Sequence, residues 1–358
     1  MICLKKYIVF FGILFPAFIP LEVFAVITGQ CSDCHTMHNS QSGTPMVSYL
    51  YGSETADPKE YLLRGTCLGC HAQGTSSMIA TINGNDVPQV YHTDATGDLA
   101  GGNFAYILGA KGTGASDAKG HNVIDFGNPE DTLTSPPGHH DPDGIGVNIT
   151  CAGIAGCHGV RTSSGGIKGS HHRNVDGKVD VADQAYNSYR FLYNVKGLED
   201  VDWEATESTA DHNEYFGATT PMIYGGNCNI CHSPQGIRPA NGTISGFCGT
   251  CHREFHVTDG IGGDTNSPFS RHPTDMILPN SGEYTGYTTY SLLAPIARTT
   301  AVPDNPGSVV NPGLDVVMCL SCHSAHATDN ADMMRWNYRS STLSTAISGC
   351  NVCHTSRN

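Results

Sequence analysis

The sequence predicts a chain that is mostly coil, with short helices and few strands. Leu, Ile, Val and Phe make up about 17% of residues 26–358, below the roughly 20% under which a highly charged chain is expected to be disordered. Glycine occurs 42 times, and turn-forming residues fill segments such as 112–120 and 300–312. Only 15% of the residues are charged, however, so the composition is not that of a polar tail. Something other than aliphatic side chains must therefore organise the chain.

The N-terminal segment has the features of an export signal. Lys5 and Lys6 precede a long apolar run that ends in Val23-Phe24-Ala25, a small-residue cleavage pattern. We therefore expect residues 1–25 to be a signal peptide and residues 26–358 to form a single elongated domain. The best helical spacing in that domain is at residues 183–195, where Tyr186, Tyr189 and Tyr193 recur on one face and are expected to pack in the core or against a cofactor.

Cysteine spacing is the strongest signal in the sequence. Of the 15 cysteines, Cys3 lies in the signal segment and the others form seven pairs. Six pairs have two intervening residues and a histidine directly after the second cysteine: Cys31/Cys34/His35, Cys67/Cys70/His71, Cys228/Cys231/His232, Cys248/Cys251/His252, Cys319/Cys322/His323 and Cys350/Cys353/His354. This is the signature of c-type haem attachment, in which both thiols bond the haem and the histidine binds its iron. Disulfides or zinc ribbons would need no histidine at that position.

The seventh pair has a longer spacing. Five residues separate Cys151 from Cys157, and His158 follows directly. A loop that contains Gly153 and Gly156 can bulge and still present both thiols, so we expect haem c here too. The alternatives are a local disulfide or a single thioether bond. The cofactor expectation is thus seven haems, or six if this pair carries none.

The second axial ligands are expected among the remaining histidines. Of 18 histidines, seven follow a cysteine pair, which leaves eleven for the distal positions. Adjacent histidines are expected to supply one ligand per pair, from His139 or His140 and from His171 or His172. The distal candidates are therefore His38, His92, His121, His140, His172, His212, His256, His272 and His326.

Three of these candidates follow a motif histidine closely. His38 and His326 come three residues after His35 and His323, and His256 comes four residues after His252. Each lies on the proximal side of its own haem, so we expect it to ligate a neighbouring haem. Methionine is the competing axial ligand, but with enough histidines present the methionines are interpreted as packing residues.

A weaker pattern resembles part of a calcium-binding loop. Residues 174–183 place oxygen-bearing side chains at Asn174, Asp176, Asp180 and Asp183 around Gly177. His172 stands where the first aspartate of such a loop is expected, so an ordinary acidic turn is the alternative.

With these motifs the chain resembles the multihaem cytochromes of metal-reducing bacteria, in particular the outer-surface cytochromes that polymerise into haem nanowires. The resemblance depends on Cys31-Ser-Asp-Cys34-His35-Thr-Met-His38, Gly120-His121-Asn122, Arg271-His272-Pro273 and Met318-Cys319-Leu-Ser-Cys322-His323-Ser-Ala-His326. It implies a coil protein wrapped around a chain of stacked bis-histidine haems. It also implies that His38, which matches an early family histidine, ligates a haem of the next subunit. The expanded pair at Cys151 and the extra motif at Cys228 depart from the six-haem members.

These observations predict an exported electron carrier rather than an enzyme, with about seven bis-histidine haems and a location at the outer surface or in the periplasm of a Gram-negative bacterium. The alternatives are a multihaem reductase of a small nitrogen or sulfur oxyanion, with one open haem site, and a periplasmic electron-storage subunit. The net charge of −14 argues against nucleic acid as a partner. Redox proteins, metal oxides and further copies of the chain, in a filament joined through His38, are the expected partners.

Overall fold

The computed structural model describes residues 29–46, 58–73, 76–127, 133, 135–138, 148–172, 178–179, 184–218, 242–256, 271–299 and 302–356. Four predicted features lie outside these residues: the signal peptide, the Cys228/Cys231/His232 motif, the pair His139 and His140, and the calcium-like loop apart from residues 178–179.

The described residues are mostly coil with short helices and small sheets, which confirms the predicted fold class. The α-helices are α1 (Leu68–His71), α2 (Ile244–Cys248), α3 (Leu343–Ala346) and α4 (Cys350–Cys353). Single 3-10 turns are η1 (Cys31–Asp33), η2 (Phe104–Tyr106), η3 (Asp117–Lys119), η4 (Ile124–Phe126), η5 (Ser170–His172), η6 (Ala185–Asn187), η7 (Tyr189–Phe191), η10 (Arg253–His256), η12 (Gly282–Gly286), η13 (Cys319–Ser321) and η14 (Ala331–Met333). No helix in these parts of the chain is long and apolar enough to span a membrane.

The largest sheet has six very short strands. Its order is β10 (Met276–Ile277), β12 (Val316–Val317), β11 (Ala297–Arg298), β9 (Glu214–Phe216), β8 (Gly197–Leu198) and β7 (Lys178–Val179), with β11 and β9 parallel and the other neighbours antiparallel. Three two-stranded pairs complete the strands: β1 (Ser40–Gln41) with β2 (Thr44–Pro45), β3 (Ile79–Ile82) with β4 (Asn85–Pro88), and β5 (Thr150–Ala152) with β6 (Gly156–His158).

Apolar side chains form three separate clusters rather than one core. Phe104 and Phe126 are central to the first, Tyr215 and Phe247 to the second, and Tyr290 to the third. A cysteine packs at the edge of each cluster: Cys151, Cys157 and Cys353, respectively. Each cluster is small because the chain holds few aliphatic residues, and each extends to a predicted haem attachment point.

The helix predicted for residues 183–195 is wrong in its described part, residues 184–195. That segment contains only η6 and η7, and Arg190 and Phe191 have left-handed backbone angles, with φ of 48° and 59°. Tertiary contacts oppose the helix: the carbonyl of Arg190 faces the ring of His158, and its N–H donates to Glu199. Of the three predicted stripe residues, Tyr189 is buried in the second cluster beside Tyr215.

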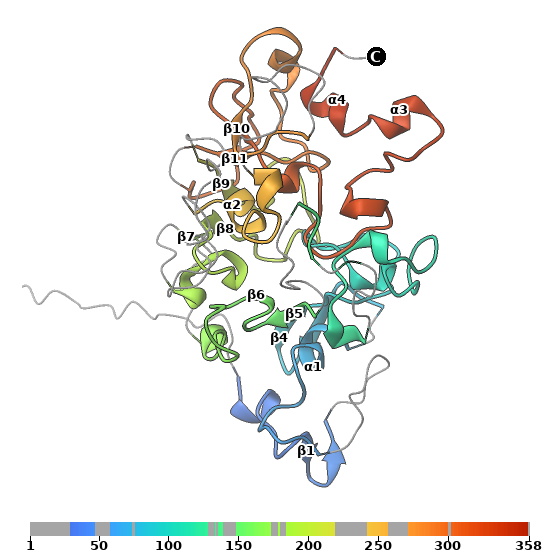
Figure 1. Ribbon diagram of the computed structural model, residues 1–358. Coiled ribbons are helices and arrows are strands. Elements are labelled where there is room, and N and C mark those ends of the chain that lie inside the picture. The colour runs from blue at the N-terminus through green and yellow to red at the C-terminus, as the bar shows by residue number, and fades with distance from the viewer. Residues whose placement is uncertain are drawn as a thin grey trace, which may run out of the picture.

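Figure 1 shows how these elements are arranged. The N-terminal pair β1–β2 lies at one end, α1 and β5–β6 follow, and α2 and then α4 lie toward the other end. The elements that carry cysteine motifs thus succeed one another through the molecule in the order of the sequence.

Candidate haem-binding sites

Five of the six described motifs form one helical turn. The N–H of the motif histidine donates to the carbonyl of the first cysteine, at 2.7 Å in His35, 2.9 Å in His71, 2.9 Å in His252, 3.1 Å in His323 and 2.9 Å in His354. One turn places the two cysteines and the histidine on neighbouring positions of a short helix. This local geometry is what attachment of one haem edge through two thiols requires.

All six described motif histidines have the same ring orientation. Nδ1 lies beside an oxygen in each: Leu62 O for His35 (3.3 Å), Pro88 O for His71 (2.9 Å), Arg190 O for His158 (2.9 Å), Pro137 O for His252 (2.9 Å), Asp332 O for His323 (2.7 Å) and Glu283 Oε1 for His354 (2.9 Å). Because these oxygens accept, Nδ1 carries the proton. The lone pair is left on Nε2, the arrangement typical of a metal-ligating histidine.

Five motif histidines face a second imidazole at a nearly constant distance. The ring centroids are 6.1 Å apart for His35 and His172, 6.2 Å for His71 and His171, 6.3 Å for His158 and His326, 6.0 Å for His252 and His121, and 6.4 Å for His354 and His272. A metal–imidazole bond is about 2 Å long and the centroid lies roughly 1 Å behind the nitrogen, so two imidazoles on one iron have centroids about 6 Å apart. The residues therefore fit haem iron between each pair.

Both members of the pair His171 and His172 take part in these arrangements. We expected one ligand from this pair, but His172 faces His35 and His171 faces His71. The two residues lie in the 3-10 turn η5, and their side chains face different motifs. Two adjacent histidines thus tie the first two predicted haem sites together. The sequence signal for this, a bare His-His pair, did not distinguish one ligand from two.

Three other distal candidates do not face a motif histidine. His256 directs Nε2 to a buried oxygen of Asp275 at 2.8 Å. His212 stacks on Tyr290 at 3.7 Å. His92 is fully buried, and neither of its ring nitrogens has a hydrogen-bond partner in the described structure. The distal role suggested for these three histidines therefore stays a prediction, because His232 lies outside the described residues.

His323 and His38 remain. Among the described residues no imidazole lies opposite His323, although its Nδ1 is hydrogen-bonded like that of the other motif histidines. His38 is exposed, with Nδ1 2.7 Å from the carbonyl of Lys59, so its Nε2 is directed away from that contact. Within the described residues, His323 is thus the one motif histidine without an opposing ring, and His38 is an exposed histidine oriented by Lys59.

The thiols of successive motifs lie close enough to influence one another's pKa. Burial, together with the neighbouring Cys34, raises the pKa of Cys70 to about 11, and burial together with Cys353 raises that of Cys322 to about 12. Two kinds of contact alternate from one motif to the next. Where the second cysteines of two motifs are neighbours, we call this a second-cysteine contact; these are Cys34/Cys70, Cys157/Cys251 and Cys322/Cys353. Where the first cysteines are neighbours, we call it a first-cysteine contact; these are Cys67/Cys151 and Cys248/Cys319. The six described motifs thereby form one line in sequence order.

The expanded pair occupies the third place in this line. Cys151 and Cys157 lie on β5 and β6, whose parallel pairing sets Ala152 opposite His158. Gly153 has φ of 96°, and a Cβ on Gly156 would lie 2.4 Å from Ala152, so both glycines are needed for the bulge. Neither cysteine is in a disulfide; they face Cys67 and Cys251, as in the other motifs. Despite the longer spacing, the two cysteines of this pair therefore face cysteines of the neighbouring motifs in the same way as in the other pairs.

Burial keeps these imidazoles neutral. Desolvation lowers the pKa of His71, His158 and His121, and brings that of His171 to about 4 and that of His326 to about 3. Neutral imidazole is the form that ligates a metal.

The lowered pKa values of the buried histidines predict how the stability of the protein changes in acid. The unfolded histidines have pKa values of about 6.5, so unfolding takes up protons; stability is complete above that pH and falls as the pH drops toward the folded values. We expect the low-spin ferric spectrum to persist well below pH 6 and to be lost near pH 4, where His171 is half protonated. Absorbance measured against pH checks this, and conversion to a high-spin spectrum near pH 6 would contradict it.

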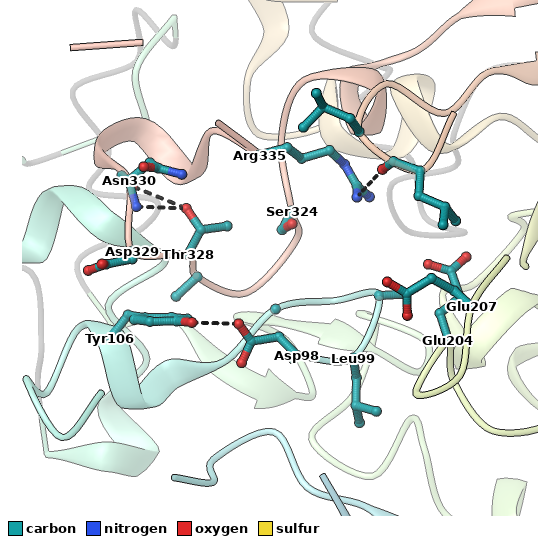
Figure 2. Close-up of a pocket in the computed structure, with 15 residues that line it drawn as sticks. Asp98, Leu99, Tyr106, Glu204, Glu207, Ser324, Thr328, Asp329, Asn330 and Arg335 are labelled. Carbon is teal, nitrogen blue, oxygen red and sulfur yellow. Dashed lines mark hydrogen bonds between the residues drawn. The ribbon is translucent and has the colours of Figure 1, made fainter. Parts of the chain in front are cut away.

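A cavity of about 270 Å³ borders the His323 motif through Ser324. Figure 2 shows the carboxylates of Asp98, Glu204 and Glu207 along one side and Arg335 opposite, and Asp329 also lines the cavity. Burial and the neighbouring Glu204 raise the pKa of Glu207. Of the four carboxylic side chains, Asp98 and Asp329 are ion-paired with Lys111 and Lys119, while Glu204 and Glu207 line the cavity together with Arg335.

Comparison with known proteins identifies a relative. The chain is 28% identical over 389 residues to the C-type cytochrome OmcS of Geobacter sulfurreducens, covering 88% of this chain and 81% of that protein. Two solved structures are similar at 20% sequence identity: the OmcS nanowires, with a TM-score of 0.47 over 92% of this chain and 98% of that one, and an OmcS filament, with a TM-score of 0.46 over 93% and 100%. No protein-family model matches the chain. The chain is thus similar in sequence to a c-type cytochrome.

Proposed function

We propose that this OmcS-like chain is an exported electron carrier that holds about seven haems c, most of them between two histidines. The observation that carries the proposal is the set of five imidazole pairs with centroids 6.0–6.4 Å apart, each joining a motif histidine to a distant one. When bound, the haems supply one-electron redox chemistry. Two strong ligands on an iron leave no position for a substrate, which favours a carrier over an enzyme.

The chain's own residues perform three tasks in this mechanism. The cysteines attach each haem by one edge, and contacts such as Cys67/Cys151 bring the edges of successive haems together. The carbonyls of Pro88, Arg190 and similar residues orient the proximal rings. The adjacent His171 and His172 hold two sites at a constant separation. Rigid, closely spaced sites favour electron transfer along the line.

We further propose that the sixth position at His323 is filled by His38 of another copy, which produces a filament. His38 is exposed and oriented through Lys59, and His323 has no opposing imidazole among the described residues. One donor and one acceptor at different places on the same chain give a head-to-tail contact that repeats without closing. OmcS, to which the chain is similar, forms nanowires and filaments.

One observation favours the second candidate, a reductase with an open haem site. An unfilled position at His323, next to the cavity bordered by Ser324, is where a small substrate would bind. The charge of that cavity argues against it. Asp98 and Asp329 are ion-paired with Lys111 and Lys119, and the carboxylates of Glu204 and Glu207 oppose Arg335, so the cavity has no net positive charge to attract an oxyanion. The carrier is therefore the better supported function.

The proposed location is the cell exterior, with metal oxides or redox proteins as electron acceptors. The chain is strongly acidic, with a net charge of −14, so a basic or metallic docking face is the complementary partner. Residues 26–358 form the proposed single domain.

Intact mass and the ferric spectrum test the proposal together. We expect the exported protein to carry the mass of seven haems and, when assembled, to have only a low-spin spectrum, because every iron then has two nitrogen ligands. A mass that corresponds to six haems would show that either the Cys151/Cys157 pair or the Cys228/Cys231 pair carries no haem. A high-spin component in the assembled form, with turnover of nitrite or hydroxylamine, would support the reductase instead.

A further inference from the structure

Three arginines lie at the second-cysteine contacts, one at each. Arg64 lies at Cys34/Cys70, Arg161 at Cys157/Cys251 and Arg335 at Cys322/Cys353. Each guanidinium lowers the pKa of a thiol at its contact, against the larger effect of burial. The arrangement recurs at every second junction along the line of motifs.

Two of these arginines are held in the same way. The main-chain N–H of Arg64 donates to the carbonyl of Cys34 at 3.0 Å, and that of Arg335 donates to the carbonyl of Cys322 at 2.8 Å. Their side chains then donate into the loop between the two cysteines, Arg64 Nη1 to Asp33 O at 3.4 Å and Arg335 Nε to Leu320 O at 2.8 Å. The same local structure is thus built twice, about 270 residues apart in a chain of 358.

Arg161 reaches the same position from a different direction. Its Nη1 donates to Thr250 Oγ1 at 2.9 Å and lies 3.8 Å from Cys251 Sγ, and its guanidinium lies 4.6 Å from the ring centre of Phe247. Thr250 is the residue before the second cysteine, as Asp33 is in the first motif. The three guanidinium groups thus reach the residues between the two cysteines of a motif from unrelated segments. What the three sites share is therefore the positive charge and not the local path of the chain.

These guanidinium groups form no direct ion pairs among the described residues, although Arg335 shares its cavity with the carboxylates of Glu204 and Glu207. In the described part of the chain none of the three guanidinium groups has a carboxylate within 4.0 Å, and the Nε atoms of Arg64 and Arg161 are buried without a hydrogen-bond partner. The first-cysteine contacts have different neighbours. Asp125 accepts from the N–H of Cys151, and His256, paired with Asp275, lies beside Cys319.

We propose that Arg64, Arg161 and Arg335 raise the reduction potentials of the two haems at each second-cysteine contact. The inference rests on the proposed function, since it requires haems on these cysteines. Reduction removes one positive charge from a haem, so a nearby cation favours the reduced form, and burial strengthens the effect. Because each of the six described motifs borders one second-cysteine contact, a haem on each of them would have one arginine beside it, which favours similar potentials among these six.

Spectroelectrochemical titration of the haem-loaded protein tests this. In Arg161→Gln the amide can still donate to Thr250 while the charge is lost, and in Arg161→Lys the charge is kept. Arg339→Gln is the matched control, because it removes the same charge from a side chain that is 62% exposed and paired with Asp332. Intact mass establishes the haem content of each variant before titration.

We expect Arg161→Gln to shift a part of the reduction curve that corresponds to two haems to lower potential, while Arg161→Lys and Arg339→Gln follow the wild type. An unchanged curve in Arg161→Gln with full haem content would overturn the proposal, and so would an equal shift in Arg161→Lys or Arg339→Gln. If Arg161→Gln fails to retain haem, Arg64→Gln decides in the same way at the first contact. A wild-type protein without haem would refute the proposed function instead.

Discussion

His38→Ala should convert filaments into single subunits without changing the number of haems. The substitution removes an exposed imidazole that is oriented by the carbonyl of Lys59 and contacts no motif histidine of its own chain. Losing a metal ligand should weaken each subunit contact by more than the roughly 10–100-fold that loss of an outer-shell partner costs. The iron on His323 then has an open position, so one high-spin haem per chain should appear. Electron microscopy and the ferric spectrum measure the two effects.

The matched control for this prediction is His38→Met. A thioether at the same position is an alternative axial ligand, so filaments should persist, and one haem should have a higher potential. Intact filaments in His38→Ala, with an unchanged spectrum, would show that the contact does not pass through this residue. A high-spin haem in wild-type filaments would show that His323 stays open after assembly.

Replacing both Cys151 and Cys157 by serine should interrupt electron transfer along the whole chain. The pair faces Cys67 on one side and Cys251 on the other, so it is the described link between the first two and the last three sites. Without this haem an electron must cross two spacings in one step, and transfer rates fall steeply with distance. We expect the mass of one haem to be lost and conduction through filaments to fall by orders of magnitude.

The double serine variant at Cys228 and Cys231 is the corresponding test of the remaining motif. It should lose the mass of one haem in the same way, because its spacing and its trailing His232 match the attachment signature. A wild-type mass in the Cys151/Cys157 variant would show that the expanded pair holds no haem. Loss of the haem with unchanged conduction would show that electrons bypass this place in the line.

Local chemistry was readable from the sequence. The cysteine spacing predicted one helical turn per motif, and the turns at Cys31, Cys67, Cys248, Cys319 and Cys350 are present. The shortage of aliphatic residues predicted a coil protein, which the structure confirms. The stretch at residues 184–195 shows the limit, because its tyrosine spacing indicated a helix while contacts with His158 and Glu199 bend the chain.

By itself the sequence predicted which residues attach haem, because two thiols and a histidine must be close along the chain to hold one haem edge. Only the tertiary structure decided which distant histidine faces each motif. His35 meets His172 and His158 meets His326 across long stretches of coil whose path has no periodic signal. It also decided that His323 is left without an opposing ring and that arginines meet every second junction. These are long-range arrangements, and they depend on how the whole chain packs rather than on the order of neighbouring residues.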